Sequence, residues 1–503
     1  MENKYDVIVI GAGLGGLECA YILQSTGKRV LVLESGLLLG GCLQMFRRGA
    51  HSFDTGFHYV GGLDEGQMLN KLFSYFGLLD LPWRKMDQNC FDEVVIENES
   101  FPFAQGYDNF VSSLAERFPD NEAELRKYVD LLRQVGDNIV HSFEPRSEVD
   151  VYQTSLFARS AYGFLKETIS NPKLIDAVSG ASLKMELNPD KLPLYVYAQI
   201  NSTFIQSAYR LAGGGMQIAK LLAQKIEDMG GKVLTNSRVT SLEGEGGAVK
   251  AVVVNNGERR FEADAFVASM HPAVVAQLLQ DAGLVRKVFA KRMTNLENTF
   301  GMLTVNIALK PNTVPYQNKN IYVYTQPDVW NLHTTPDPSH AVKAMMISFP
   351  PPTDGGDFAT HVDLLTPMNW SDVQPWFGTK VGCRGNDYVA LKETVAQHCI
   401  DLAKTKIPNL SEAIESKWIS TPLTYADYTA TSCGSAYGIR KDFNNVMLTV
   451  LTPKTPVANL FLTGQSLNLH GILGTSMTSI FTCAELLGMP QVLSELQRGG
   501  FNK

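Results

Sequence analysis

The feature that most constrains the fold is the stretch from Tyr5 to Glu34, which reads YDVIVIGAGLGGLECAYILQSTGKRVLVLE. An apolar run, a glycine turn, a helical pattern and a second apolar run follow one another, and this order predicts a βαβ unit. Glycines at such a turn let a pyrophosphate approach the helix N-terminus, and Glu34, 23 residues after Gly11, is placed to accept hydrogen bonds from an adenosine ribose. The stretch therefore predicts a dinucleotide site with contacts from Gly11, Gly13, Leu14, Gly15, Gly16, Glu34 and Ser35.

A second glycine-rich stretch runs from Gly40 to Gly62 and reads GGCLQMFRRGAHSFDTGFHYVGG. Its cysteine, histidines and aspartate could hold zinc, but their separations match neither a paired-cysteine nor an H-E-x-x-H pattern, so no metal is expected. Adjacent glycines give clearance for an extended cofactor, and a lone thiol without a neighbouring base favours packing over nucleophilic chemistry. An ordinary surface loop is the alternative. We interpret the stretch as the floor of a cofactor pocket, with Asp54 bracing the loop and contacts from Gly40, Gly41, Cys42, Gly56 and Tyr59.

Two later stretches add further contacts to the same cofactor. Residues 213–242 predict a helix and two short strands, where Val239 could offer backbone groups to an adenine ring, and the apolar run 263–269 ends at Ser269. Residues 459–488 predict a strand, a glycine turn and a helix that begins near Gly474. Gly464 and Gln465 would border a ribityl chain, and the helix N-terminus at Ile472 and Gly474 would face the pyrimidine edge of a flavin. Together with the opening unit, these stretches favour FAD over NAD.

The spread of these contacts predicts an α/β fold with a discontinuous Rossmann-type FAD-binding domain. Its pieces are expected at 1–85, 205–290 and 455–503. An inserted substrate domain of α+β character, with a mixed or antiparallel sheet and helices, is expected at 86–204 and 291–454. No second G-x-G-x-x-G follows a strand and no C-x-x-C is present, which argues against a flavin disulfide reductase.

Composition narrows the partners and the compartment. The net charge is −7 and basic residues form no cluster larger than a pair, so no nucleic acid partner is expected. Seven cysteines without a C-x-x-C favour reduced thiols in the cytoplasm. No secretory signal is recognised and no apolar run reaches the ~18 residues of a membrane span, so any membrane contact would be peripheral, on the inner face. The apolar segment 151–169 predicts either core packing or a helical lip that rests on a bilayer.

Several motifs along the chain carry a family resemblance. They are GGC at 40–42, FDTGFHYVG at 53–61, NIYVY at 320–324, ISFPP at 347–351, NDYVALKETV at 386–395, SAYG at 435–438 and NLFLTGQ at 459–465. With them the chain resembles the phytoene desaturase and carotenoid isomerase superfamily, and within it the all-trans-retinol 13,14-reductase branch. The resemblance implies non-covalent FAD and a hydrophobic polyene or isoprenoid substrate that gains or loses two hydrogens or is isomerised. NAD(P)H is a candidate transient electron donor. Ser466 departs from the acidic residue that this branch carries after GQ.

Hydrogen transfer at a carbon–carbon bond also needs a group that donates or accepts a proton. The candidate catalytic residues are His58, Tyr437 and His470, with Tyr59 as a further candidate. We expect a long apolar cavity that opens near 151–169 and closes on the flavin beside these side chains. Two other function classes stay open: a flavin amine oxidase, whose pocket would end in an aromatic pair, and a lipid carrier that keeps FAD as structure. The sequence identifies no protein partner.

Overall fold

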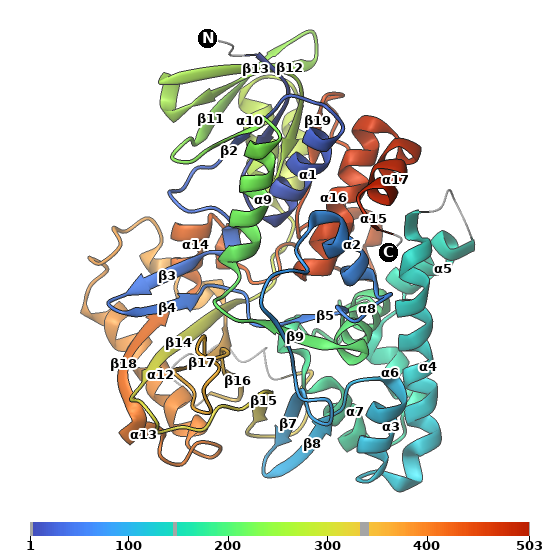
Figure 1. The fold of residues 1–503 in the computed structure, drawn as a ribbon, viewed down its shortest axis with the longest axis vertical. Coiled ribbons are helices and arrows are strands. Elements are labelled where there is room, and N and C mark those ends of the chain that lie inside the picture. The colour runs from blue at the N-terminus through green and yellow to red at the C-terminus, as the bar shows by residue number, and fades with distance from the viewer. Residues whose placement is uncertain (1–3, 144–147, 332–341, 502–503) are drawn as a thin grey trace.

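The computed structural model describes residues 4–143, 148–331 and 342–501; the side chains of 140–141 and 148–152 lie outside the description. Figure 1 shows two large sheets, one near the top of the view and one below it, with helices packed around both. Two smaller sheets, β3–β4 and β5–β9–β6, lie between them.

The first sheet has seven strands in the order β10-β2-β1-β13-β12-β11, with β19 paired to β13. Its β10, β2, β1, β13 and β19 pair in parallel, whereas β11 and β12 form an antiparallel extension. The strands are β1 (Lys4–Ile10), β2 (Val30–Leu33), β10 (Lys232–Leu234), β11 (Val239–Glu245), β12 (Ala248–Val254), β13 (Arg259–Ala268) and β19 (Leu460–Leu462). One sheet is therefore assembled from an early, a middle and a late segment of the chain.

Helices cover this sheet because its strands are apolar on both faces, as parallel strands usually are. On one face lie α1 (Leu14–Ser25), α9 (Met216–Asp228) and α16 (Gly471–Leu487), which share one apolar core with the sheet. On the other lie α10 (Pro272–Asp281) and α11 (Lys287–Thr294). Buried Glu18 of α1 accepts a hydrogen bond of 2.6 Å from Ser476 of α16, so the early and late helices are joined directly.

The second sheet is mixed and has the order β18-β14-β17-β16-β15-β7-β8, in which β7 and β15 pair in parallel. Its strands are β7 (Asp92–Ile96), β8 (Glu99–Phe103), β14 (Gly301–Leu309), β15 (Asn320–Tyr324), β16 (Ala344–Ser348), β17 (His361–Met368) and β18 (Ile414–Ser420). Side chains alternate between its faces, as strand geometry requires. Tyr322 and Tyr324 pack towards the helices of residues 107–206, whereas Ile321 and Val323 pack towards α12 (Asn386–Ala403).

The remaining elements connect or flank these layers. The short strands are β3 (Met45–Arg48), β4 (His51–Asp54), β5 (Val60–Gly61), β6 (Trp83–Lys85) and β9 (Ala208–Leu211). The helices are α2 (Met68–Phe76), α3 (Tyr107–Ala115), α4 (Glu122–Asn138), α5 (Glu148–Phe157), α6 (Ala161–Thr168), α7 (Pro172–Ser179), α8 (Leu194–Gln206), α13 (Leu410–Ala413), α14 (Pro422–Thr429), α15 (Val446–Thr449) and α17 (Met489–Arg498).

The predicted fold class is confirmed: a Rossmann-type sheet from three segments carries an inserted part with a mixed sheet and helices. The helix expected near Gly474 begins three residues earlier, at Gly471. The numerical domain limits stay a prediction.

The apolar segment 151–169 forms the end of α5 and all of α6. Leu156, Phe164 and Leu165 are buried in the apolar core that α5 and α6 share with the neighbouring helices and the second sheet. The side chains of Val151 and Tyr152, also expected to contribute, lie outside the described residues. The buried positions favour the core-packing interpretation over the helical lip. Across the parts of the chain that the structure describes, no helix is both long and apolar enough to span a membrane.

Candidate functional site

A cavity of about 630 Å³ runs from the carboxyl ends of the parallel strands of the first sheet to the helix-covered face of the second sheet. Ligands bind at these strand ends in open α/β sheets. The predicted cofactor contacts that line the cavity are Gly11, Gly13, Leu14, Gly15, Glu34, Ser35, Gly40, Gly41, Cys42, Gly56, Tyr59, Val239, Ser269, Gly464, Gln465, Ile472 and Gly474, and the predicted catalytic residues that do so are His58, Tyr437 and His470. The structure thus brings residues from all three segments to one cavity; their contact with the cofactor stays a prediction.

Gly16 is the predicted residue that does not line this cavity. A Cβ at this position would lie 2.1 Å from the carbonyl oxygen of Gly11, inside contact distance. Its place in the motif therefore follows from how closely α1 packs on the turn after β1, rather than from contact with a ligand.

Glu34 forms one end of the cavity, at the end of β2. Its carboxylate accepts hydrogen bonds from the backbone N–H of Ala12 at 2.9 Å and of Gly36 at 2.7 Å. The nearby lining includes Ser237, Arg238 and Val239, which lead into β11. A carboxylate fixed in this way can accept further hydrogen bonds from ribose hydroxyls, so this end suits an adenosine.

The middle of the cavity passes between glycines of the early and late segments. A Cβ added to Gly13 or to Gly464 would meet only the Ser269 hydroxyl, at 3.8 Å in each case. A Cβ at Gly41 would come 3.5 Å from the Cα of Gly13. Side chains at these positions would occupy the channel itself. The absence of side chains here fits the passage of a pyrophosphate and a ribityl chain, so the cavity fits FAD.

The loop after β4 forms part of the cavity wall through Gly56, Phe57 and His58. The side chain of Asp54 accepts a hydrogen bond of 2.7 Å from the backbone N–H of Gly215, as expected for a residue that braces this loop. Burial raises the pKa of Asp54 to about 7, although this hydrogen bond opposes the shift.

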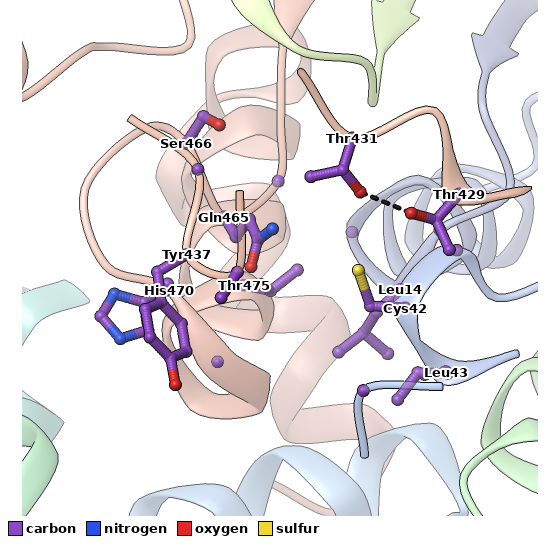
Figure 2. Close-up of a pocket in the computed structure, with 18 of the residues that line it drawn as sticks. Leu14, Cys42, Leu43, Thr429, Thr431, Tyr437, Gln465, Ser466, His470 and Thr475 are labelled. Atoms are coloured by element: carbon purple, nitrogen blue, oxygen red, sulfur yellow. Dashed lines mark hydrogen bonds between the residues drawn. The ribbon is translucent and has the colours of Figure 1, made fainter. Parts of the chain in front are cut away.

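Cys42 lines the same cavity. Its thiol points towards Thr429 and Thr431, whose hydroxyls hydrogen bond to each other at 2.5 Å (Figure 2). Burial raises the pKa of the Cys42 thiol, so it is less often a thiolate than an exposed cysteine would be. This agrees with the packing role expected of it. Among the described residues, no group of three His, Cys, Asp or Glu side chains is placed to hold a metal ion.

The rings of Tyr437 and His470 lie 4.5 Å apart and inclined by 34° (Figure 2). Tyr437 donates its hydroxyl proton to the carbonyl of Leu183, and the Nε2 of His470 lies 3.0 Å from the carbonyl of Lys184. Burial lowers the pKa of His470 to about 4, and burial together with the charge of Arg210 lowers the pKa of His58 to about 4. Both imidazoles are therefore neutral near pH 7.

The sequence analysis missed a buried polar cluster behind the cavity wall. Tyr59 donates a hydrogen bond of 2.9 Å to Asp92 and lies 2.7 Å, oxygen to oxygen, from Tyr322. Lys184 approaches Asp92 to 3.6 Å and, like both tyrosines, lines the cavity. The motif NIYVY predicts a strand that carries Tyr322, but no local signal connects this strand with Asp92 or Lys184.

A second, larger cleft of about 1330 Å³ lies beside the cavity. It is bordered by the β3–β4 hairpin, the glycines at 213–214, β18, the start of α12 and α14. The two spaces share a wall made of Gln44, Phe57, His58, Tyr425 and Tyr428.

Residues 14–487 match the family described as flavin containing amine oxidoreductase. The chain belongs to this family. FAD is therefore its cofactor, in agreement with the glycine-lined channel.

Individual relatives share nearly the whole chain. An all-trans-retinol 13,14-reductase of Rattus norvegicus is 28% identical, covering 99% of this chain and 88% of its own. Prolycopene isomerase 2 of an Oncidium hybrid is 24% identical over 92% of this chain and 80% of its own. The structure of cyclohexylamine oxidase from Brevibacterium oxydans superposes with a TM-score of 0.60 at 16% identity, covering 98% of this chain and 99% of that one, which shows the shared fold.

Proposed function

We propose that this FAD-dependent oxidoreductase acts on a carbon–carbon double bond of a hydrophobic polyene or isoprenoid. The observation that carries the proposal is the lining of the cavity beyond the cofactor channel. It is apolar apart from a few polar groups and consists chiefly of Leu69, Leu183, Ile200, Phe204, Met302, Met346, Leu365 and Leu469. Burial of apolar surface gains on the order of 25 cal/mol per Å², so such a wall can hold a polyene without charged contacts.

The names of the relatives support the same substrate class, since one reduces a retinoid alcohol and another isomerises a carotenoid. When bound, the flavin would exchange a hydride with one carbon of the double bond. The chain's own residues would hold the polyene against the flavin and exclude water. Saturation, desaturation and redox-neutral isomerisation all remain within this proposal.

An amine oxidase is the alternative from a different substrate class, and the charges of the cavity argue against it. Among the described lining residues, Glu34 is the single carboxylate, and it belongs to the adenosine end. The charged side chain at the apolar end is Lys184, which would repel an ammonium group. An amine oxidase pocket would end in an aromatic pair around the amine. Here the pair is one phenol and one imidazole, Tyr437 and His470, and each ring contacts a backbone carbonyl of residues 183–184.

Anaerobic mixing of the photoreduced protein with retinoids, carotenoids and quinones tests the proposal. At least one polyene should oxidise the flavin or be isomerised, as followed by flavin absorbance and product chromatography. In parallel arms, simple amines should leave the oxidised flavin unchanged, and NADH and NADPH should be tried as reductants. Rapid reduction by amines, with no reaction of any polyene, would replace this proposal by the amine oxidase alternative.

The second cleft supports a peripheral membrane contact at a different place from the segment 151–169. Its rim carries exposed apolar side chains, with Val381, Val389 and Tyr428 between 48% and 56% exposed. Basic residues of the same cleft are Arg47, Arg48, Lys220, Arg384, Lys392 and Lys417. Figure 1 places β3, β4 and α12 on the side of the molecule away from α5 and α6. We propose that this rim meets the inner face of an anionic bilayer and that lipid enters towards the wall shared with the cavity.

Binding to vesicles that contain anionic lipid tests this contact. A protein with both Val381→Glu and Val389→Glu should sediment with the vesicles several-fold less than the unchanged protein. Val288→Glu is the matched control, because Val288 is 79% exposed but lies on α11, outside the cleft. Equal loss in the control, or no loss in the double variant, would contradict the placement. A cytoplasmic location is proposed on the seven cysteines, none of which is in a disulfide.

A further inference from the structure

A buried ion pair lies at the wall of the cavity. Lys184 ends a short 3₁₀ helix, Ser182–Lys184, and its side chain is 9% exposed. Its Nζ lies 3.6 Å from a carboxylate oxygen of Asp92, which is fully buried in β7. Lys184 lines the cavity, whereas Asp92 lies behind it. A buried ion pair costs desolvation and seldom adds stability, so its presence at a ligand cavity calls for a functional reason.

The carboxylate of Asp92 is the centre of a hydrogen-bonded network. The hydroxyl of Tyr59 donates to one of its oxygens at 2.9 Å, and the side-chain amide of Asn320 donates to the other at 2.8 Å. Tyr322 extends the network through Tyr59, at 2.7 Å. Buried Arg210 donates to the amide oxygen of Asn320 at 2.7 Å. Hydrogen bonds thus join two cavity-lining tyrosines to Asp92 and connect Asp92 to a second buried cation.

The backbone fixes Lys184 beside the candidate catalytic rings. The carbonyl of Lys184 faces the Nε2 of His470 at 3.0 Å, and the carbonyl of Leu183 accepts from the hydroxyl of Tyr437. Because Lys184, Tyr437 and His470 line the same cavity as Gln465 and Ile472, the lysine is held towards the end of the cofactor channel where the flavin ring is expected. Lys184 also lies 4.6 Å above the ring of Phe204, which keeps the side chain in place.

Among the groups at this end of the cavity, the directions of the pKa shifts favour Lys184 as a proton donor. His58 and His470 have pKa values of about 4 and carry no proton to give near pH 7. Burial holds the pKa values of Tyr59, Tyr322 and Tyr437 well above the usual range of tyrosine. Burial lowers the pKa of Lys184, although Asp92 opposes the shift, so it is a stronger acid than an exposed lysine. The titratable and charged groups that surround it are Asp92, Tyr59, Tyr322, Arg210, Tyr437 and His470.

We propose that Lys184 is the proton donor of the reaction and that Asp92, itself held by Tyr59 and Asn320, fixes the ammonium at the cavity wall, while solvent water returns the proton to Lys184 once the product has left. The inference rests on the proposed function. When bound, the flavin would supply a hydride to one carbon of the double bond, while an Nζ–H bond of Lys184 breaks and its proton forms the C–H bond at the neighbouring carbon. The alkene is reduced by two electrons, the reduced flavin is oxidised, and Lys184 is left as a neutral amine. In desaturation the same amine accepts the proton.

A trapping experiment reads out the position and acidity of Lys184 without turnover. The oxidised holoenzyme is incubated with all-trans-retinal, whose aldehyde forms an imine only with a neutral amine, and the imine is reduced with borohydride. Peptide mass spectrometry should find the adduct at Lys184, with a pH midpoint below that of adducts at exposed lysines. Lys184→Gln should abolish this adduct alone. Equal labelling of surface lysines, with none at Lys184, would overturn the placement of the ammonium in the polyene cavity.

Single-turnover kinetics test the chemical role. Lys184→Gln should slow saturation of the double bond by roughly 10² to 10⁴-fold, with flavin absorbance unchanged. Asp92→Asn should shift the pH profile of the rate. Lys173→Gln is the matched control, since Lys173 pairs with Glu99 on the surface, and its rate should not change. A rate within a few-fold of the unchanged protein for Lys184→Gln would overturn the proposal. If the unchanged protein reduces no polyene, the proposed function fails instead.

Discussion

Glu34 shows how one side chain can assemble a nucleotide site before a ligand arrives. Its carboxylate accepts hydrogen bonds from the backbone of Ala12, in the turn after β1, and of Gly36, in the loop after β2. Its position could be predicted from spacing because the partners of its side chain lie in the first βαβ unit or directly after it. Lys184 and Asp92 could not be predicted in this way, because their contact depends on how a 3₁₀ helix and β7 meet in the folded chain.

Replacement of Glu34 should weaken FAD retention, and the loss should be larger for alanine than for glutamine. Glu34→Ala removes the acceptor for the ribose hydroxyls and for the N–H groups of Ala12 and Gly36, which should cost about 1–3 kcal/mol of binding free energy. Glu34→Gln keeps one acceptor oxygen and should lose less. Flavin fluorescence after ultrafiltration, at several FAD concentrations, measures both. Unchanged retention in Glu34→Ala would contradict the placement of the adenosine at this end.

Helix α1 and the turn before it show how an element depends on single glycines. The motif predicted the strand, the turn and the helix, because each signal is local. The start of α16 was placed three residues late, since apolar periodicity marks the buried face of a helix but not its first turn. The pairing of β19 with β13 in the first sheet had no sequence signal of its own, because it joins residues nearly 200 positions apart.

Two alanine substitutions in this element should affect different properties, one the stability of the fold and the other the binding of FAD. Gly16→Ala places a Cβ 2.1 Å from the carbonyl oxygen of Gly11, so the flavin-free protein should lose about 1–3 kcal/mol of unfolding free energy through overpacking. Gly13→Ala has a φ of −71° and no close neighbour, so folding should be unaffected, but its methyl enters the cofactor channel and should weaken FAD binding.

Urea unfolding of the flavin-free proteins and FAD titration separate the two effects. A stable Gly16→Ala protein would mean that α1 can move away from the turn. Normal FAD binding by Gly13→Ala would mean that the cofactor does not pass this glycine.

At the scale of the whole molecule, two large sheets share one cavity, and buried acids lie in strands beside it. The mixed sheet could be predicted only in kind, because the parallel pairing of β7 with β15 links the two insertions and leaves no periodic trace. The segment 151–169 illustrates the same limit, since its apolar residues fit a core or a membrane equally well until their neighbours are known. Asp54, at the end of β4, and Asp363, in β17, were placed near each other only by the fold.

This pair of carboxyls should make a contribution to stability that falls as pH rises. Burial raises the pKa values of Asp54 and Asp363 to about 7 in the folded state, from about 3.8. At these two carboxyls the folded state therefore binds more protons than the unfolded state between these values, so their contribution to the free energy of unfolding should fall as pH rises from about 4 to about 7, whereas the contribution of His58 and His470 rises. Each carboxyl contributes on the order of a few kcal/mol.

Asp54→Asn and Asp363→Asn should flatten this fall and raise the melting temperature at pH 7, because a neutral amide keeps an acceptor oxygen for Gly215 or a partner for Asn306. Asp6→Asn is the control of opposite sign. Hydrogen bonds from Arg29 lower the pKa of Asp6, so its contribution is present above pH 4 and lost below it. Urea titrations from pH 4 to pH 8 measure all three. A fall of the same size in Asp54→Asn and in the unchanged protein would show that this carboxyl is charged in the folded state.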